Sequence, residues 1–380
     1  MSGNPNTTHA AHDQPSSSDT ATPTAPTTKT KRPPRPLRWK LRLTIYGSII
    51  ASALIAHHVM FRMPGTSHTG PLPPITQQQL ELAANLQQHV THLASTIGER
   101  NTRHPNNLNA AADYIQQHLT NLGYNPQRQT YNITHPYDQT PLPCHNIEIE
   151  ITGSTHPDRI VIIGAHYDSV PSSPGANDNA AGTAALLELA RILQNSNPKH
   201  TLRLVAFTNE EPPYFTTENQ GSYVYAKRSA DRNENITAML SIDGLGYYND
   251  QPNTQNYPQP FATFYPDTAN FVGFVGNLRS APLLRTAVAS FRSHTAFPSE
   301  GAAVPGFIEG AGWSDHYSFW QFGYPGIMIT DTLPFRYKHY HDYSDTPDQL
   351  NYQHMARITQ GIAHILADLA QATHPNQHVQ

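Results

Sequence analysis

Residues 159–168 read Arg-Ile-Val-Ile-Ile-Gly-Ala-His-Tyr-Asp, and this stretch decides the fold of the 380-residue chain. Four consecutive β-branched side chains are typical of a strand that is buried on both faces, as the strands of parallel sheets are. An imidazole at His166 and a carboxylate at Asp168 end the run. Because binding sites of open α/β sheets form at the carboxyl ends of the strands, the stretch predicts a central parallel strand that leads into a functional site.

Strand and helix patterns alternate on both sides of this run. An alternating apolar pattern predicts a strand at 146–152, and apolar segments predict strands at 201–207, 236–242, 271–275 and 326–330. Helical patterns predict helices at 80–97, 108–122, 179–193, 221–229, 281–291 and 352–372. Such alternation predicts a three-layer, doubly wound α/β fold, with a mostly parallel central sheet and helices on both faces. We expect one domain over residues 75–380, with an aperiodic surface excursion at 247–267.

The amino-terminal end has a different composition. Residues 1–42 carry seven Lys or Arg against two Asp, and few large apolar side chains, which predicts a disordered basic tail. The apolar run 43–61 is about long enough to form one transmembrane helix, and residues 62–74, rich in Pro, Gly, Ser and Thr, form a linker. The preceding positive charge predicts a cytoplasmic amino terminus and an extracytoplasmic domain, periplasmic or extracellular.

We therefore expect a single-pass signal anchor that contacts the lipid bilayer through residues 43–61. A cleaved signal peptide, which would yield a secreted protein, and a buried core helix are the alternatives.

Charge and cysteine content exclude several classes of protein. Beyond residue 42 the chain carries 17 Lys or Arg against 26 Asp or Glu, which argues against nucleic acid as a partner. The single cysteine, Cys144, excludes an internal disulfide and any cysteine-based zinc finger. No pattern in the sequence indicates an oligomeric state.

Carboxylates and imidazoles also follow other predicted strands. Glu210 and Glu211 follow the strand at 201–207, Asp243 follows the strand at 236–242, Asp178 precedes a predicted helix, and His341 lies on a late loop. Taken singly, a histidine here is most often structural and an aspartate most often caps a helix or lies in a turn. Two adjacent glutamates most often lie on a solvated face or in a first helical turn. Gathered at one sheet edge, the carboxylates would need a cation to neutralise them. Imidazoles and carboxylates without a thiolate favour zinc, or else cobalt or manganese, and one bridging carboxylate would suit a pair of ions.

Six short motifs, in this order, resemble the di-zinc exopeptidase family of secreted bacterial leucyl aminopeptidases and glutamate carboxypeptidase, with glutaminyl cyclase more distant. They are Gly-Ala-His166-Tyr-Asp168-Ser-Val, Gly-Ala-Asn-Asp178-Asn-Ala-Ala-Gly, Asn-Glu210-Glu211, Asp243-Gly, Ser314-Asp315-His316, and Tyr-His341 followed by Asp345-Thr346. The resemblance implies two Zn²⁺ ions per chain, bridged by Asp178.

The same resemblance assigns roles to the remaining groups. It implies that His166 and Asp243 complete one zinc site, that Glu211 and His341 complete the other, and that Glu210 is the general base. It also implies a cis peptide bond after Asp178. Asp168, two residues beyond His166, is a candidate to orient its imidazole.

Two stretches depart from the family pattern. Some relatives place a tyrosine just before Ser-Asp-His to stabilise the oxyanion, whereas Gly310–Trp313 precedes that motif here. Tyr214, Tyr317 and His316 are the substitutes that the sequence offers, and Asp315 is a further tentative site residue. Residues 212–217 replace a short Gly-Leu turn, and either line the pocket or form a longer surface loop.

The implied activity is hydrolysis of peptide bonds by a metal-activated water, with peptides as substrates. An aminopeptidase is favoured over a carboxypeptidase because Arg279, Arg285 and Arg336 are scattered and form no cluster for a substrate carboxylate. One alternative is a single-zinc glutaminyl-peptide cyclotransferase, but in such enzymes Ser follows the aspartate, whereas Asn-Ala-Ala-Gly follows Asp178 here. The other is a non-catalytic membrane-tethered ectodomain, although such relatives have lost ligands or the base.

Overall fold

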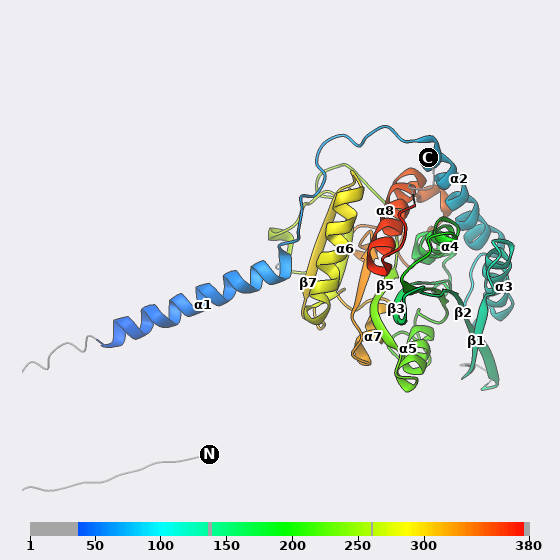
Figure 1. Ribbon diagram of the computed structural model, residues 1–380. Helices are drawn as coiled ribbons and strands as arrows, with labels where there is room; N and C mark the ends of the chain where they lie inside the picture. The colour runs from blue at the N-terminus through cyan, green and yellow to red at the C-terminus, as the bar shows by residue number, and fades with distance from the viewer. Residues whose placement is uncertain (1–36, 136–138, 260, 376–380) are drawn as a thin grey trace, which may run out of the picture. The chain divides into compact units, whose positions relative to one another are not determined.

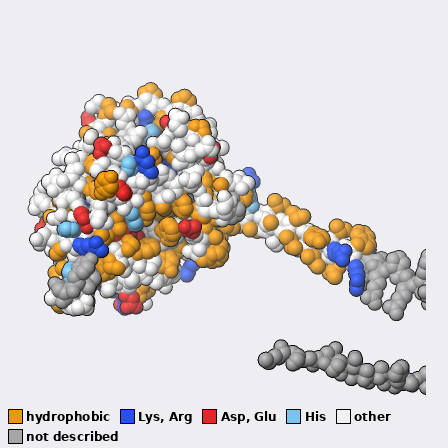
Figure 2. Space-filling view, turned by 180° about the vertical axis from the view of Figure 1, so that it is seen from behind, with side chains coloured by type: hydrophobic (Ala, Val, Ile, Leu, Met, Phe, Trp, Pro, Cys, Tyr) orange, Lys and Arg blue, Asp and Glu red, His pale blue; other side chains and the backbone are white. Residues whose placement is uncertain are grey.

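The computed structural model describes residues 37–135, 139–259 and 261–375, so most of the predicted tail lies outside the described part (Figure 1). The chain divides into two units, residues 1–52 and residues 53–380. Helix α1 (Leu37–Phe61) begins earlier than the apolar run at 43–61 and ends with it. Figure 2 shows basic side chains near the start of this helix and hydrophobic ones along the rest. Its 24 residues from Arg38 to Phe61 are long and apolar enough to cross a membrane.

One eight-stranded sheet forms the centre of the second unit, in the order β1-β2-β4-β3-β5-β8-β6-β7. The strands are β1 (Gln127–Thr134), β2 (Pro141–Ile151), β3 (His156–His166), β4 (His200–Phe207), β5 (Asn235–Ile242), β6 (Val272–Asn277), β7 (Ser299–Val304) and β8 (Gly326–Thr330). The central strands β4, β3, β5 and β8 run parallel to one another, and β6 pairs parallel with β7. Antiparallel pairs join β1 to β2, β2 to β4, and β6 to β8.

Helices cover both faces of this sheet, which confirms the predicted three-layer α/β fold (Figure 1). They are α2 (Gln77–Thr91), α3 (Pro105–Asn121), α4 (Gly182–Leu193), α5 (Gly221–Asp231), α6 (Ala281–His294), α7 (His316–Gln321) and α8 (Tyr352–Ala370). Side chains of β3 alternate between the two layers. Val161 and Ile163 pack in the core with α2, α4, α6 and α8, whereas Ile160 and Ile162 pack in a second core with α5 and α7.

The carboxyl ends of the parallel strands meet at one edge. His166, the last residue of β3, pairs with Phe207, the last residue of β4. Helix α4 begins at Gly182 rather than at the predicted residue 179, because residues 176–181 form a wide turn in which Asp178 and Asn179 have non-helical angles. The Asp178–Asn179 peptide bond is cis, as the resemblance implied.

Residues 247–267 are more than the predicted surface excursion. The described residues of this range, 247–259 and 261–267, include no strand and a single short 3₁₀ turn, Phe261–Thr263, yet Gln255 and Phe261 are buried. Phe261 belongs to a cluster of apolar and aromatic side chains, which we call the aromatic wall. Its members are Tyr257, Phe261, Tyr265, Val275, Ala302, Val304, Ile308 and Ala311.

The end of helix α1 packs on the aromatic wall. Met60 and Phe61 contact it, and the Phe61 ring stacks on Phe264 with their centroids 4.7 Å apart. The Arg285 guanidinium donates hydrogen bonds to the carbonyl oxygens of His58 and Val59, at 2.9 and 3.0 Å. The last turn of this helix is therefore part of the packing of the second unit.

Candidate metal centre

Six polar side chains meet at the carboxyl edge of the parallel strands. His166 ends β3, Glu210 and Glu211 follow β4, Asp243 follows β5, Asp178 lies in the turn before α4, and His341 lies on the loop before α8. All are buried except His341, whose side chain is 28% exposed. These six groups lie far apart in the sequence but come together in the structure.

Asp178 is shared by two triads. Its Oδ1 lies 3.3 Å from His166 Nε2, which is also 3.5 Å from Asp243 Oδ1. Its Oδ2 lies 3.1 Å from His341 Nε2, which is also 3.2 Å from Glu211 Oε2. In each triad, the three side chains offer ligand atoms close enough to one another to hold one metal ion.

Several atoms of these triads are buried without a hydrogen bond. They include both ring nitrogens of His166, Asp243 Oδ1 and Glu211 Oε1, although carboxylate oxygens lie 3.3–3.5 Å from the imidazole. Buried polar atoms are normally satisfied by a partner or an ion. The donor set of two imidazoles and three carboxylates, with no thiolate, fits zinc.

The pKa values of the site residues also indicate that the site binds a cation. Burial, together with the neighbouring Asp178 carboxylate, raises the pKa of Glu211. Burial lowers the pKa of His341, but hydrogen bonds to Asp178 and Glu211 outweigh it and raise that pKa to about 10. Without metal, Glu211 and His341 therefore tend to hold protons that a bound metal ion would displace.

Glu210 lies beside the triads and is held by Asp168. Its Oε2 is 3.9 Å from His166 Nε2, farther than the triad carboxylates. The Asp168 carboxylate accepts hydrogen bonds from the backbone N–H groups of Glu210 and Glu211, at 3.1 and 3.2 Å, and lies 3.5 Å from His166 Nδ1. Asp168 therefore positions the glutamate loop as well as facing the imidazole.

Two further residues fix the turn that carries Asp178. The Asp345 carboxylate accepts hydrogen bonds from the backbone N–H groups of Asn177 and Asp178, at 2.8 and 3.1 Å. Arg100 is fully buried, and donates to the carbonyl oxygens of Tyr167, Pro174 and Gly175 at 2.5–2.7 Å. Burial lowers the pKa of Arg100 to about 10, so the guanidinium stays charged at neutral pH. Sequence reasoning missed Arg100, because no pattern surrounds it.

Three tentative site residues do not reach the cavity beside the triads. The Tyr214 hydroxyl donates to Thr102 Oγ1 at 3.2 Å. His316 is buried, its Nε2 lies 2.8 Å from the Ala311 carbonyl oxygen, and burial lowers its pKa to about 4. Asp315 is buried near His166 and Asp243, and burial raises its pKa. None of the three lines the cavity, and neither does Tyr317.

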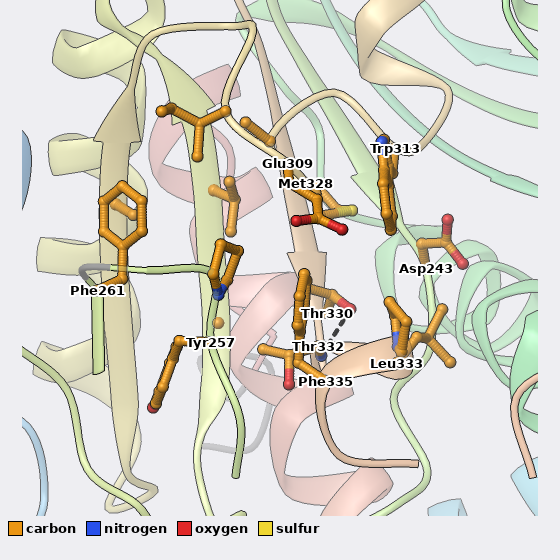
Figure 3. A pocket seen from close by; sticks show the side chains of 18 of the residues that line it. Asp243, Tyr257, Phe261, Glu309, Trp313, Met328, Thr330, Thr332, Leu333 and Phe335 are labelled. Atoms are coloured by element: carbon orange, nitrogen blue, oxygen red, sulfur yellow. Dashed lines mark hydrogen bonds between the residues drawn. The ribbon is translucent and has the colours of Figure 1, made fainter. Parts of the chain in front are cut away.

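The cavity beside the triads is largely apolar. In Figure 3 the Asp243 carboxylate lies at one end of it and Phe261 at the other. Its lining includes Phe215, Tyr257, Phe261, Tyr265, Phe271, Phe274, Val304, Ile308, Trp313, Met328, Leu333 and Phe335. Pro212 and Phe215 belong to the loop that replaces the Gly-Leu turn, so this loop lines the cavity. Tyr340, which the sequence did not single out, also lines it, with its ring stacked on His341 at 3.8 Å.

The chain is similar to known proteins over the region that carries these motifs. The model of Peptidase family M28 matches residues 146–366. The uncharacterized protein YfbL of Escherichia coli (strain K12) is 34% identical over 335 residues, which cover 86% of this chain and 99% of YfbL. A probable zinc metalloprotease of Pyrenophora teres f. teres is 26% identical, over 80% of this chain and 70% of its own. The LapA aminopeptidase of Legionella pneumophila has a similar fold, with a TM-score of 0.59 and 18% identity over 80% of this chain and 78% of its own.

Proposed function

Because this chain belongs to peptidase family M28, we propose that it is a two-zinc aminopeptidase that removes residues from the free amino termini of peptides. Zinc metallopeptidase chemistry and peptide substrates follow from the family itself. The observation that carries the two-zinc proposal is the pair of triads that share Asp178, with one imidazole 3.1 Å and the other 3.3 Å from its two oxygens.

In this proposal His166, Asp178 and Asp243 hold one zinc ion, and Asp178, Glu211 and His341 hold the other. Bound zinc supplies a Lewis acid for the scissile carbonyl group and lowers the pKa of a water to about 7. Glu210 would take a proton from the attacking water and pass it to the leaving amine. Its position beside the triads, rather than within them, supports this role.

Tyr340 takes the place of the missing oxyanion tyrosine in this proposal. Its ring lines the cavity and stacks on the proposed ligand His341. Burial and the nearby carboxylates, Asp178 first among them, raise the pKa of its hydroxyl, so that it stays a hydrogen-bond donor. We propose that it donates to the carbonyl oxygen of the scissile bond.

The charges of the cavity support an aminopeptidase over a carboxypeptidase. Among the described lining residues are Glu300 and Glu309, besides the carboxylates of the site, and no Lys or Arg. Arg336, one of the three scattered arginines, donates to the Phe271 carbonyl oxygen at 2.9 Å and to Gln255. Such a cavity favours a substrate ammonium group and opposes a substrate carboxylate. Its apolar lining favours a large apolar first residue.

We further propose that helix α1 anchors the chain in a bilayer, with residues 1–42 in the cytoplasm, residues 62–74 as a linker and the catalytic domain 75–380 outside. The length and apolar composition of Arg38–Phe61 support this placement, as does the positive charge at its start.

The experiment that tests the activity uses the full chain in detergent with amino-acyl anilides and their amino-blocked analogues, with zinc and then with a chelator. We expect chelator-sensitive release from free amino termini alone. The Glu210→Gln variant should lose nearly all turnover but keep its zinc by elemental analysis. Cyclisation of amino-terminal glutaminyl peptides without hydrolysis would indicate the cyclotransferase instead. No turnover of either kind would indicate a non-catalytic ectodomain.

A further inference from the structure

A second group of histidines lies far from the proposed catalytic centre. His294 is the last residue of α6, His364 lies on α8, and His374 follows the end of that helix. Each offers a ring nitrogen, and these atoms all lie within 4.8 Å of one another. Helices α6 and α8 lie side by side (Figure 1). The three imidazoles thus come from two packed helices and the segment that follows them.

Two of these rings point nitrogens at each other. His364 Nδ1 and His374 Nδ1 are 3.0 Å apart. Tetrahedral zinc with Zn–N bonds of about 2.0–2.1 Å separates its ligand nitrogens by about 3.3 Å. The two rings are therefore spaced much as two ligands of one ion would be.

The Asp368 carboxylate contacts the other ring nitrogen of His374, Nε2. Asp368 Oδ1 lies 3.1 Å from His374 Nε2, and Asp368 Oδ2 accepts a hydrogen bond from the Ser290 hydroxyl. A carboxylate on one ring nitrogen fixes the proton there and leaves the lone pair of the other nitrogen for a metal. This places the lone pair of His374 on Nδ1, the atom that faces His364.

His294 completes the group from the exposed side. Its ring stacks on that of His364, with centroids 4.4 Å apart and planes 9° apart, so it must turn to point a nitrogen at a shared ion. The side chains of His294 and His374 are 32% and 24% exposed, which leaves room for that rotation and for an ion to enter. His364 is buried beneath them.

We propose that His294, His364 and His374 bind a divalent transition-metal ion of the zinc type, with Asp368 positioning His374. The ion would tie the segment after α8 to helices α6 and α8. This histidine site is separate from the proposed catalytic centre. The Lys199 N–H donates to the Ala370 carbonyl oxygen, which places the end of α8 at the amino end of β4, whereas Glu210 and Glu211 follow the carboxyl end of that strand. Eight residues of strand span about 25 Å.

A third group of ligand-type residues provides the contrast. His89, His118 and Glu188 also offer atoms within 4.8 Å of one another. There, however, the Glu188 carboxylate already binds the Arg191 guanidinium at 2.7 Å and accepts from Asn85 at 3.2 Å. The nearby positive charge opposes a cation. Asp368, by contrast, faces two of the proposed ligands, with His374 at 3.1 Å and His294 at 3.8 Å.

The test starts from the full chain with Asp178→Ala, which should empty the catalytic centre. After gel filtration in zinc-free buffer, we expect this chain to retain one zinc per molecule by elemental analysis, and to bind Co²⁺ with the visible absorption of a tetrahedral site. Adding His374→Ala or His294→Ala should abolish both signals. Adding His118→Ala, the matched control, should leave both unchanged.

In the Asp178→Ala background, two results would overturn the proposal: a chain that retains no metal, or one whose metal is lost with His118→Ala but kept with His374→Ala. His374→Ala in the otherwise unaltered chain should leave peptide hydrolysis unchanged, which shows that the variant folds. It should also lower the zinc content by one ion. Hydrolysis with no such decrease would count against the site.

Discussion

The backbone N–H of Glu210 donates a hydrogen bond to Asp168 Oδ1 at 3.1 Å. Asp168→Asn replaces one acceptor oxygen by an amide that cannot accept, so the loop carrying Glu210 should lose its fixed position. We predict a 10- to 100-fold lower kcat, roughly the cost of losing such supporting groups, with zinc still bound. Steady-state kinetics and elemental analysis measure both. The exposed Asp158→Asn serves as control, and an unchanged kcat for Asp168→Asn would refute the positioning role.

Arg100 should matter more for stability than for chemistry. Arg100→Met removes a buried donor from the carbonyl oxygens of Tyr167, Pro174 and Gly175. Leaving buried acceptors unpaired lowers the free energy of unfolding by about 3 kcal/mol. Urea unfolding of the zinc-loaded protein measures this loss. Arg159→Met, on an exposed side chain, should change it by less than about 0.5 kcal/mol, and equal stabilities of the two variants would contradict the prediction.

Zinc should stabilise the protein more strongly as the pH rises. Burial raises the pKa of Glu211, and hydrogen bonds to two carboxylates raise that of His341 to about 10 despite its burial. Both pKa values lie above those of the unfolded chain, so the metal-free folded protein binds extra protons. Its free energy of unfolding therefore falls as the pH rises from the pKa values of the unfolded chain to these raised ones.

Zinc must displace those protons, so its affinity grows about tenfold per pH unit for each proton released. The zinc-induced rise in Tm should therefore increase between about pH 5.5 and pH 8. Thermal melts with and without zinc at each pH test this. The same melts on Asp178→Ala should show a much flatter profile, and a flat profile for the unaltered chain would mean that the triads do not bind zinc.

Phe61 should influence which substrates the cavity accepts. Its ring packs against Phe261 and Tyr265, with centroids 5.7 and 6.0 Å away, and both of these residues line the cavity. Phe61→Ala should raise KM for peptides with a large apolar first residue by about three- to tenfold, or about 0.7–1.4 kcal/mol, with little change for alanyl peptides. Ile55→Ala, an exposed side chain on the same helix, is the control. Equal changes for large and small first residues would contradict this prediction.

The sequence predicted those parts of the molecule that are periodic or fully buried. Strands β3, β4, β5 and β8 are rich in apolar residues and buried over most of their length. Because parallel strands end at the same edge of a sheet, this pattern predicted that His166, Glu211 and Asp243 lie together. Strand β7 was missed because Ser299–Val304 consists mostly of small residues, and β1 because few of its side chains are buried. Both are edge strands, which depend on pairing more than on their own pattern.

The rest of the site depends on contacts between distant segments. Arg100 acts through backbone carbonyl groups, which no sequence pattern encodes. Tyr340 is marked only by its place before His341, and its stacking on that ring appears only in three dimensions. Cavity-lining residues such as Tyr257 and Tyr265 belong to no α-helix or strand, so no periodic pattern in the sequence marks them.

The packing of Phe61 on the aromatic wall connects the proposed membrane anchor to the lining of the substrate cavity. With helix α1 as the proposed anchor, cleavage within residues 62–74 would release residues 75–380 from the bilayer. It would also separate Phe61 from Phe261 and Tyr265, which line the cavity. The released form would lack the Phe61 side chain that packs on the aromatic wall. One cleavage could thus change both the location and the substrate range of molecules already made, without new synthesis.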